Sequence, residues 1–182
     1  DTSLQSIYKL YLFSYNSNSV NVIQLGRALR DVLDIMNTKD STNFGSKPIV
    51  IMGHSMGGLI GRYFLSLQQS QGAYSGKAGG ERVLKLITLG SPHHGSPMAN
   101  GPAMVAEAGI VWGSTLSLFN LYFYSAGGPA YNQVNRSDLF WDNYNYLLDY
   151  NTYTGERNIF LNFLNNDTTY DNKIIAYGGT IS

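Results

Sequence analysis

The feature of this sequence that most constrains its fold is a lone serine between two glycines, at a point where a strand pattern gives way to a helical one. The apolar run PIVIMG (48–53) predicts a buried strand and leads directly into Gly53-His54-Ser55-Met56-Gly57. A helical stripe follows at once, formed by Leu59, Ile60, Tyr63, Phe64 and Leu67. A sharp strand-to-helix turn exposes its serine at the carboxyl end of a sheet, where the hydroxyl can act as a nucleophile.

The neighbours of Ser55 supply the other parts of such a site. Side chains at Gly53 and Gly57 would collide in so tight a turn, so we expect both positions to be glycine for a steric reason. Met56 opens the helix, and its backbone N–H is therefore the expected first donor of an oxyanion hole. Chance is the alternative explanation in a chain with 20 glycines. The flanking strand and helix are the context that favours function.

Further strands and helices place this turn in an α/β fold. Residues 7–15, 82–90 and 173–180 are predicted strands. A helix is predicted over 22–36, with Asn18 or Ser19 as its cap, and another ends near 160–164. The alternation of strands and helices predicts right-handed crossovers and a parallel sheet flanked by helices.

The chain is expected to form one domain over residues 1–182. Residues 96–150 break the alternating rhythm, because they mix Gly and Pro with many aromatic residues. We interpret them as a lid-like excursion that covers a site. The alternative is an aromatic surface excursion that closes one edge of the core.

Composition excludes several classes of function. The 12 basic and 12 acidic residues form no basic cluster, so no nucleic-acid partner is expected. The chain has no cysteine, which excludes disulfides, thiolate metal sites and cysteine catalysis. No apolar run reaches the ~18 residues of a spanning helix, so we expect no stable membrane span. Histidines and aspartates do not cluster at ligand spacing, and we expect no metal or organic cofactor.

Two blocks of the chain resemble a known family. IVIMGHSMGGLIGRYFL (49–65) resembles the nucleophile elbow of α/β-hydrolase lipases and esterases. VLKLITLGSPHHGSPMA (83–99) resembles the strand and loop that follow that elbow helix, and FSYNSN (13–18) is also similar to the family. The resemblance implies an α/β-hydrolase fold and a Ser-His-Asp/Glu mechanism, with an acyl-enzyme on Ser55. It also implies an ester or lipid substrate, and places His93 and His94 as residues that line the pocket.

The catalytic base is hard to place. His54 precedes Ser55 in a strand, where neighbouring side chains point to opposite faces, so we expect it to pack under the turn. His93 and His94 lie in the loop that shapes the site in the family, and they are weaker candidates for the base.

The catalytic acid has no good candidate either. Asp167 and Asp171 precede the last strand and would lie at the wrong end of the sheet. The carboxylates of the excursion are interpreted as solvated charges: Glu107, Asp138, Asp142 and Asp149. We therefore expect residues 1–182 to be the middle portion of a longer hydrolase, with the acid, the base and the second oxyanion donor outside it.

Two alternatives to an ester hydrolase remain. An acyltransferase would use the same serine, with an alcohol in place of water in deacylation. A non-catalytic binding domain on a hydrolase fold is the other, since fold does not fix function. The resemblance favours secretion and allows interfacial contact with lipid, while compartment and oligomeric state stay open.

Overall fold

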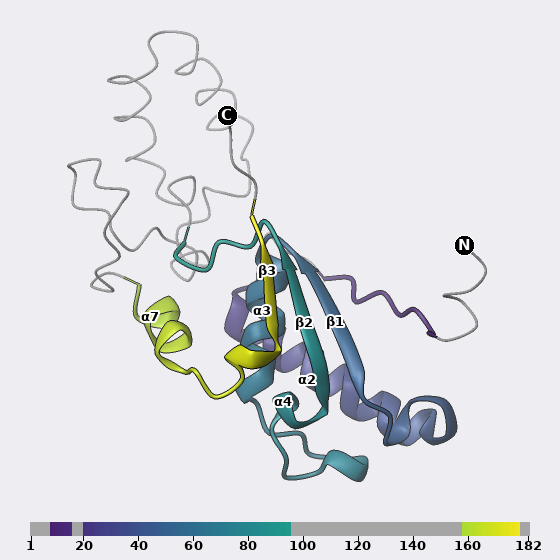
Figure 1. Ribbon diagram of the computed structural model, residues 1–182. Coiled ribbons are helices and arrows are strands. Elements are labelled where there is room, and N and C mark those ends of the chain that lie inside the picture. Colours follow the sequence, from purple (N-terminus) through teal and green to yellow (C-terminus); the bar gives the residue numbers. More distant parts are fainter. Residues whose placement is uncertain (1–7, 16–19, 96–157, 179–182) are drawn as a thin grey trace, which may run out of the picture.

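The structure is a computed structural model that describes residues 8–15, 20–95 and 158–178 (Figure 1). Strands and helices alternate along the chain as the sequence predicts. In chain order the elements are α2 (Val22–Lys39), a π-helical turn η1 (Ser41–Gly45), β1 (Ile49–His54), α3 (Met56–Ser66), a 3-10 turn η2 (Gly72–Tyr74), α4 (Gly79–Arg82), β2 (Val83–Leu89), α7 (Ile159–Asn166), a 3-10 turn η6 (Asp171–Lys173) and β3 (Ile174–Tyr177).

The three strands form one parallel sheet in the order β1-β2-β3. The register pairs His54 with Leu89 and Leu89 with Tyr177, so all three strands end at the same edge. Parallel neighbours need crossover connections, and α3 lies in the connection between β1 and β2. The predicted fold class, an α/β fold with a parallel sheet flanked by helices, is confirmed. The carboxyl edge of such a sheet is where these folds bind their ligands.

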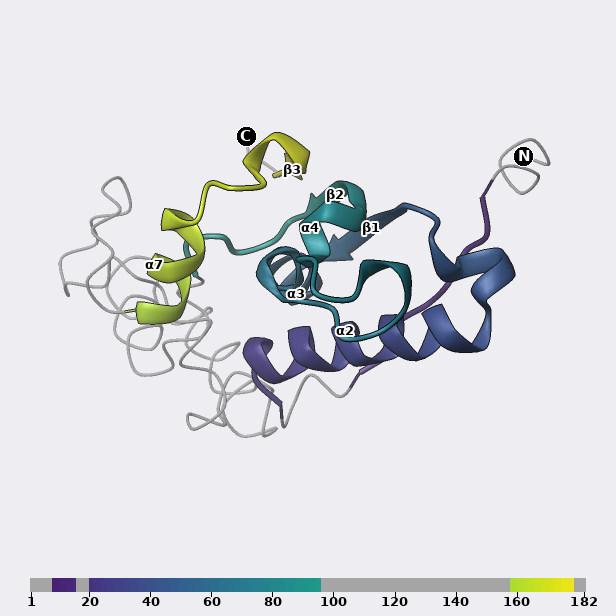
Figure 2. The ribbon, with the colours of Figure 1, turned by 90° about the horizontal axis from the view of Figure 1, so that it is seen from below.

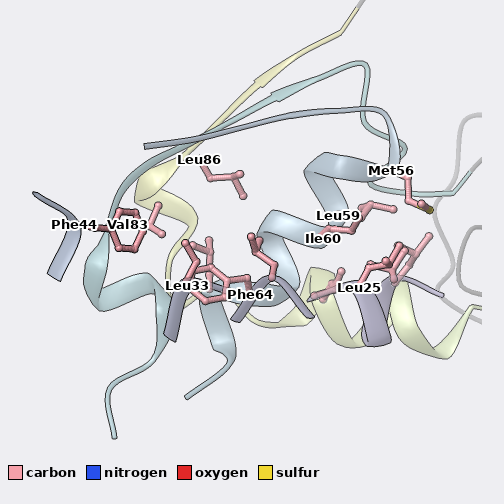
Figure 3. Packing of buried hydrophobic residues seen from close by; sticks show 14 residues of the cluster. Leu25, Leu33, Phe44, Met56, Leu59, Ile60, Phe64, Val83 and Leu86 are labelled. Carbon is pink, nitrogen blue, oxygen red and sulfur yellow. The ribbon is translucent and has the colours of Figure 1, made fainter. Parts of the chain in front are cut away.

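Helices α2 and α3 cover the same face of the sheet (Figure 2). Glycines allow these layers to come close. A β-carbon on Gly61 of α3 would meet Leu86 Cδ1 of β2 at 2.7 Å, and one on Gly26 of α2 would meet Tyr63 Cδ1 of α3 at 2.5 Å. The core between the layers is apolar (Figure 3) and consists of Val22, Leu25, Leu29, Leu33, Phe44, Met56, Leu59, Ile60, Phe64, Leu65, Val83, Leu86, Leu161 and Leu164.

The opposite face of the sheet is left open by the described residues. Val50, Met52 and Tyr177 on that face are 47%, 66% and 59% exposed. A parallel sheet usually has both faces covered. Here α3 and the apolar core lie on the one face that the described helices cover.

The predicted N-terminal strand (7–15) is wrong for the part of it that the structure describes. Residues 8–15 form no strand, and Leu10 and Leu12 are 95% and 92% exposed. The segment instead contacts η1, where the rings of Tyr11 and Phe44 meet edge-on with centroids 5.4 Å apart. Residues with high strand propensity form a strand only where a neighbour offers the pairing, and β1 does not pair with this segment.

The cap of α2 also differs from the prediction. Asn21 is the N-cap, rather than Asn18 or Ser19. Gln24 N donates to Asn21 Oδ1 at 2.9 Å, and Asn21 N donates to Gln24 Oε1 at 3.4 Å. This capping box satisfies two backbone N–H groups at once, which fixes the start of the helix at Val22.

The predicted excursion over 96–150 lies outside the described residues, and so do its four carboxylates. Within the parts of the chain that are described, no helix has the length and apolar character needed to cross a bilayer.

Candidate active site

Ser55 occupies the turn between β1 and α3 in a strained conformation. β1 ends at His54 and α3 begins at Met56, which leaves Ser55 alone between them with φ 52° and ψ −128°. Within residues 8–15, 20–95 and 158–178, Ser55 is the only residue other than glycine with a positive φ. Such a conformation costs of order 1–3 kcal/mol and persists only where the surrounding structure imposes it.

The backbone of Ser55 is held while its side chain is left open to solvent. Ser55 N donates to Leu89 O of β2 at 2.9 Å, and Gly58 N donates to Ser55 O at 3.1 Å. The Ser55 side chain is exposed and makes no capping hydrogen bond. The turn therefore presents an exposed hydroxyl at the carboxyl edge of the sheet.

The two glycines of the turn are not equivalent. A β-carbon on Gly53 would come within 2.5 Å of Gly57 C, Gly57 O and Gly58 N, which are backbone atoms that cannot yield. At Gly57, the nearest described atom to an added β-carbon is Tyr15 Oη at 3.4 Å, an ordinary contact. The expected collision is therefore found at Gly53 and is absent at Gly57.

Met56 joins the turn to the core. Its side chain is 8% exposed and belongs to the buried cluster, as Figure 3 shows at the start of α3. As the first helical residue, Met56 has a backbone N–H without a partner in its own helix. The helix dipole adds partial positive charge at this end. The start of α3 therefore offers a backbone donor and partial positive charge next to Ser55.

His93 lies in the loop after β2, and its ring contacts the side chain of Thr88. His93 Nε2 and Thr88 Oγ1 are 3.0 Å apart, and Thr88 is 1% exposed. Burial lowers the pKa of His93 to about 4, with smaller contributions from the positive charge of Arg62 and from His94. His93 is therefore neutral at pH 7, and its ring is committed to Thr88.

His94 and His54 are both exposed. His94 Nδ1 is 3.5 Å from Asn165 Nδ2 of α7. The expectation that His54 packs beneath the turn is wrong, because His54 lies on the face of the sheet that no described helix covers. Among the described residues, neither histidine nor any other side chain hydrogen-bonds the Ser55 hydroxyl.

The two aspartates before β3 lie far from Ser55. Asp167 Oδ2 accepts a hydrogen bond from Ser66 Oγ at 2.6 Å, at the last residue of α3. Ser66 is the last of the 11 residues of α3 and Ser55 directly precedes the first, a separation of about 16 Å along the helix axis. Asp171 lies in η6, directly before β3 begins. In this geometry neither carboxylate reaches the turn.

The sequence did not predict the hydrogen bonds that connect α3, α7 and the loop after β2. Arg62 Nη1 donates to Asn165 Oδ1 at 2.6 Å, and Asn165 Nδ2 donates to His93 O at 2.9 Å. A β-carbon on Gly58 would meet Ser91 Oγ at 2.0 Å and Thr88 Cβ at 3.0 Å. These contacts join residues up to 103 positions apart, and no local pattern signals them.

The described residues contain no group of three metal-ligating side chains.

The chain is similar to known proteins in sequence and in structure. No curated protein matches the chain. Among solved structures, the mature form of a Bacillus licheniformis lipase, BlEst2, is similar with 17% identity and a TM-score of 0.34. The match covers 65% of this chain and 46% of the lipase, so the chain spans about half the length of that enzyme. A family model described as "PGAP1-like alpha/beta domain" matches residues 5–107, more than half of the 182 residues. The chain therefore belongs to the family of the PGAP1-like alpha/beta domain.

Proposed function

We propose that this chain carries the nucleophile of a serine hydrolase that cleaves carboxylic esters, as a lipase or esterase does. The observation that carries the proposal is the exposed Ser55 with φ 52°, placed between β1 and α3. A strained serine at this position costs stability and is retained for a reason other than packing. The family match and the α/β fold agree with a hydrolase.

In the proposed reaction, Ser55 Oγ attacks the ester carbonyl carbon and gives its proton to a general base. The tetrahedral intermediate carries its negative charge on the former carbonyl oxygen, which accepts a hydrogen bond from Met56 N–H. The ester C–O bond then breaks, and the alcohol leaves with the proton from the base. Water attacks the acyl-Ser55 in the same manner and releases the carboxylic acid.

The base and its carboxylate partner are assigned to residues outside those described. His93 is bonded to Thr88, and Asp167 is bonded to Ser66 at the far end of α3. The second oxyanion donor is assigned in the same way. His94 lies at the rim of the site in this proposal, whereas His93 supports it from beneath. The substrate is an uncharged ester with an apolar acyl chain.

The test is turnover of p-nitrophenyl esters of increasing chain length by the full native polypeptide. Wild type is expected to release p-nitrophenol, and Ser55→Ala is expected to lose at least ~10³-fold in kcat because the nucleophile is gone. Ser46→Ala, at an exposed serine, is the matched control and should retain wild-type activity. Equal turnover by Ser55→Ala and wild type would overturn the proposal.

The same assay with a competing alcohol separates hydrolysis from acyl transfer. A hydrolase forms mainly the carboxylic acid, whereas an acyltransferase forms the new ester. A folded polypeptide that binds esters without turning them over would indicate a binding domain.

A further inference from the structure

We propose that His93 is a positioning residue for the Ser55 turn, acting through Thr88 and the backbone of Leu89. The inference rests on the proposed function for its consequence, the reactivity of Ser55. Its geometric basis is a series of contacts that starts at Ser55, directly before α3, and ends at Arg62 of α3.

The first contact is between the turn and the end of β2. Ser55 N donates to Leu89 O at 2.9 Å, so the position of Leu89 sets the position of the strained residue. Leu89 directly follows Thr88, whose side chain is buried and points into the interface between sheet and helix. A β-carbon on Gly58 would lie only 3.0 Å from Thr88 Cβ. Thr88 is therefore packed against the first turn of α3, so a shift of Thr88 would displace that turn.

The second contact fixes Thr88 to the loop after β2. Thr88 Oγ1 and His93 Nε2 form a hydrogen bond of 3.0 Å between residues five positions apart. His93 Nδ1 is buried and has no hydrogen-bond partner among the described residues. The ring thus makes one specific bond, through the nitrogen farther from its backbone.

The third contact returns to α3 by way of α7. His93 O accepts a hydrogen bond from Asn165 Nδ2 at 2.9 Å, and Asn165 Oδ1 accepts one from Arg62 Nη1 at 2.6 Å. Arg62 Nη2 also donates to Leu164 O at 3.0 Å. Arg62 lies on α3 itself, two turns after Ser55. His93 is therefore held by its backbone on one side and holds Thr88 by its ring on the other.

Little free space remains in this arrangement. A β-carbon on Gly58 would come 2.0 Å from Ser91 Oγ, so the loop already packs against the helix backbone. The charged groups that face His93 are Arg62 from α3 and, when protonated, His94 from its own loop. Both disfavour a charge on the ring, so His93 acts as a neutral spacer of fixed length.

A spacer of fixed length predicts a specific pattern of substitutions. In His93→Gln the side-chain amide reaches about as far as Nε2 and can keep the bond to Thr88. In His93→Asn the same amide is one methylene shorter and cannot. Thr88→Val removes the hydroxyl and keeps the shape of the side chain. Thr38→Val is the matched control, because it removes a hydroxyl that bonds only Ile35 O of its own helix, at 2.9 Å.

Two quantities are measured on the folded full native polypeptide. One is the rate at which a serine-reactive phosphonate labels Ser55. The other is hydrogen exchange in a peptide spanning residues 54–58, which contains the Ser55 amide. Thr88→Val and His93→Asn should each slow labelling about tenfold, the rate equivalent of one hydrogen bond, and should accelerate exchange. The double variant should be no slower than either single variant, because both remove the same bond.

His93→Gln and Thr38→Val should remain near wild type in both measurements. The inference is overturned if Thr88→Val changes neither quantity, or if His93→Gln and His93→Asn lose labelling equally. Absence of labelling in wild type would contradict the proposed function instead. The exchange measurement would then still decide whether His93 positions the turn.

Discussion

Gly53 lies so close to Gly57 that a β-carbon on Gly53 would come within 2.5 Å of the carbonyl carbon and oxygen of Gly57. A β-carbon on Gly57 meets no such obstacle, since the nearest described atom to it is Tyr15 Oη at 3.4 Å. The two glycines of the G-x-S-x-G pattern therefore serve different purposes. The first permits the turn to close, and the second leaves space beside the helix start.

The unequal glycines give the first prediction. Gly53→Ala should lower the free energy of unfolding by about 2–3 kcal/mol, because backbone atoms cannot move aside, and should abolish labelling of Ser55 by a phosphonate. Gly57→Ala should leave the free energy of unfolding unchanged or raise it by about 0.5–1 kcal/mol, because alanine favours a helix. Urea unfolding of both variants checks this. Equal losses would show that the turn is not closed as described.

The strain at Ser55 gives the second prediction. Glycine adopts φ 52° and ψ −128° readily, whereas alanine does not. Ser55→Gly should therefore exceed Ser55→Ala in free energy of unfolding by about 1 kcal/mol, although both lack the hydroxyl. Urea unfolding of the two inactive variants measures the difference directly. A less stable Ser55→Gly would mean that the backbone relaxes once the side chain is removed.

The parts of the site that depend on neighbouring residues in the sequence could be predicted. The apolar run before Gly53 and the helical stripe after Met56 located β1 and α3, and together they predicted the tight turn at Ser55. The N-terminal segment failed because strand pairing is a non-local property. Tyr11 and Phe13 have strand propensity, but no described strand pairs with their segment.

The cap of α2 failed for a different reason. Several cap-forming residues precede Val22, and only Asn21 has a glutamine three residues later that completes the capping box. The support beneath the turn could not be predicted at all. The Arg62–Asn165 hydrogen bond joins residues 103 positions apart, and the Thr88–His93 bond depends on the path of a loop.

The buried His93 gives the third prediction, on pH. Its pKa is about 4 in the folded chain, against an ordinary value of 6.5, chiefly because of burial. Between these values the unfolded chain binds a proton that the folded chain does not. The free energy of unfolding is therefore highest above pH 6.5 and decreases as the pH falls toward 4. The total decrease is about 1–3 kcal/mol, after allowance for the partial exposure of His93.

Urea unfolding at pH 7, 5.5 and 4.5 tests this for wild type and His93→Gln. The free energy of unfolding should fall more steeply with decreasing pH in wild type, because glutamine does not titrate. An identical slope in both proteins would mean that His93 is protonated in the fold like an exposed histidine.

The Ser66–Asp167 hydrogen bond gives the fourth prediction. This bond is the main cause that lowers the pKa of Asp167 below its ordinary 3.8, with Thr169 contributing next. A lowered carboxyl pKa stabilises the fold above pH 3.8 and loses its effect as the pH falls through the folded value. Ser66→Ala should therefore cost about 1 kcal/mol at pH 7 and less near pH 3, by thermal unfolding.

Asp167→Asn tests the placement of the same carboxylate with respect to catalysis. Because Asp167 lies at the far end of α3 from Ser55, the variant should label with a phosphonate at the wild-type rate at pH 7. A large loss of labelling in a folded Asp167→Asn protein would return Asp167 to the list of candidates for the catalytic acid.

The measurement that tests the account most directly is mass spectrometry of the full native polypeptide after treatment with a serine-reactive phosphonate. Intact mass and peptide mapping would be taken from the same sample, with Ser55→Ala as the control. We predict a single adduct on Ser55, none on the other serines, and none in Ser55→Ala. A folded polypeptide that remains unlabelled at Ser55 would contradict the assignment of Ser55 as the nucleophile of a hydrolase.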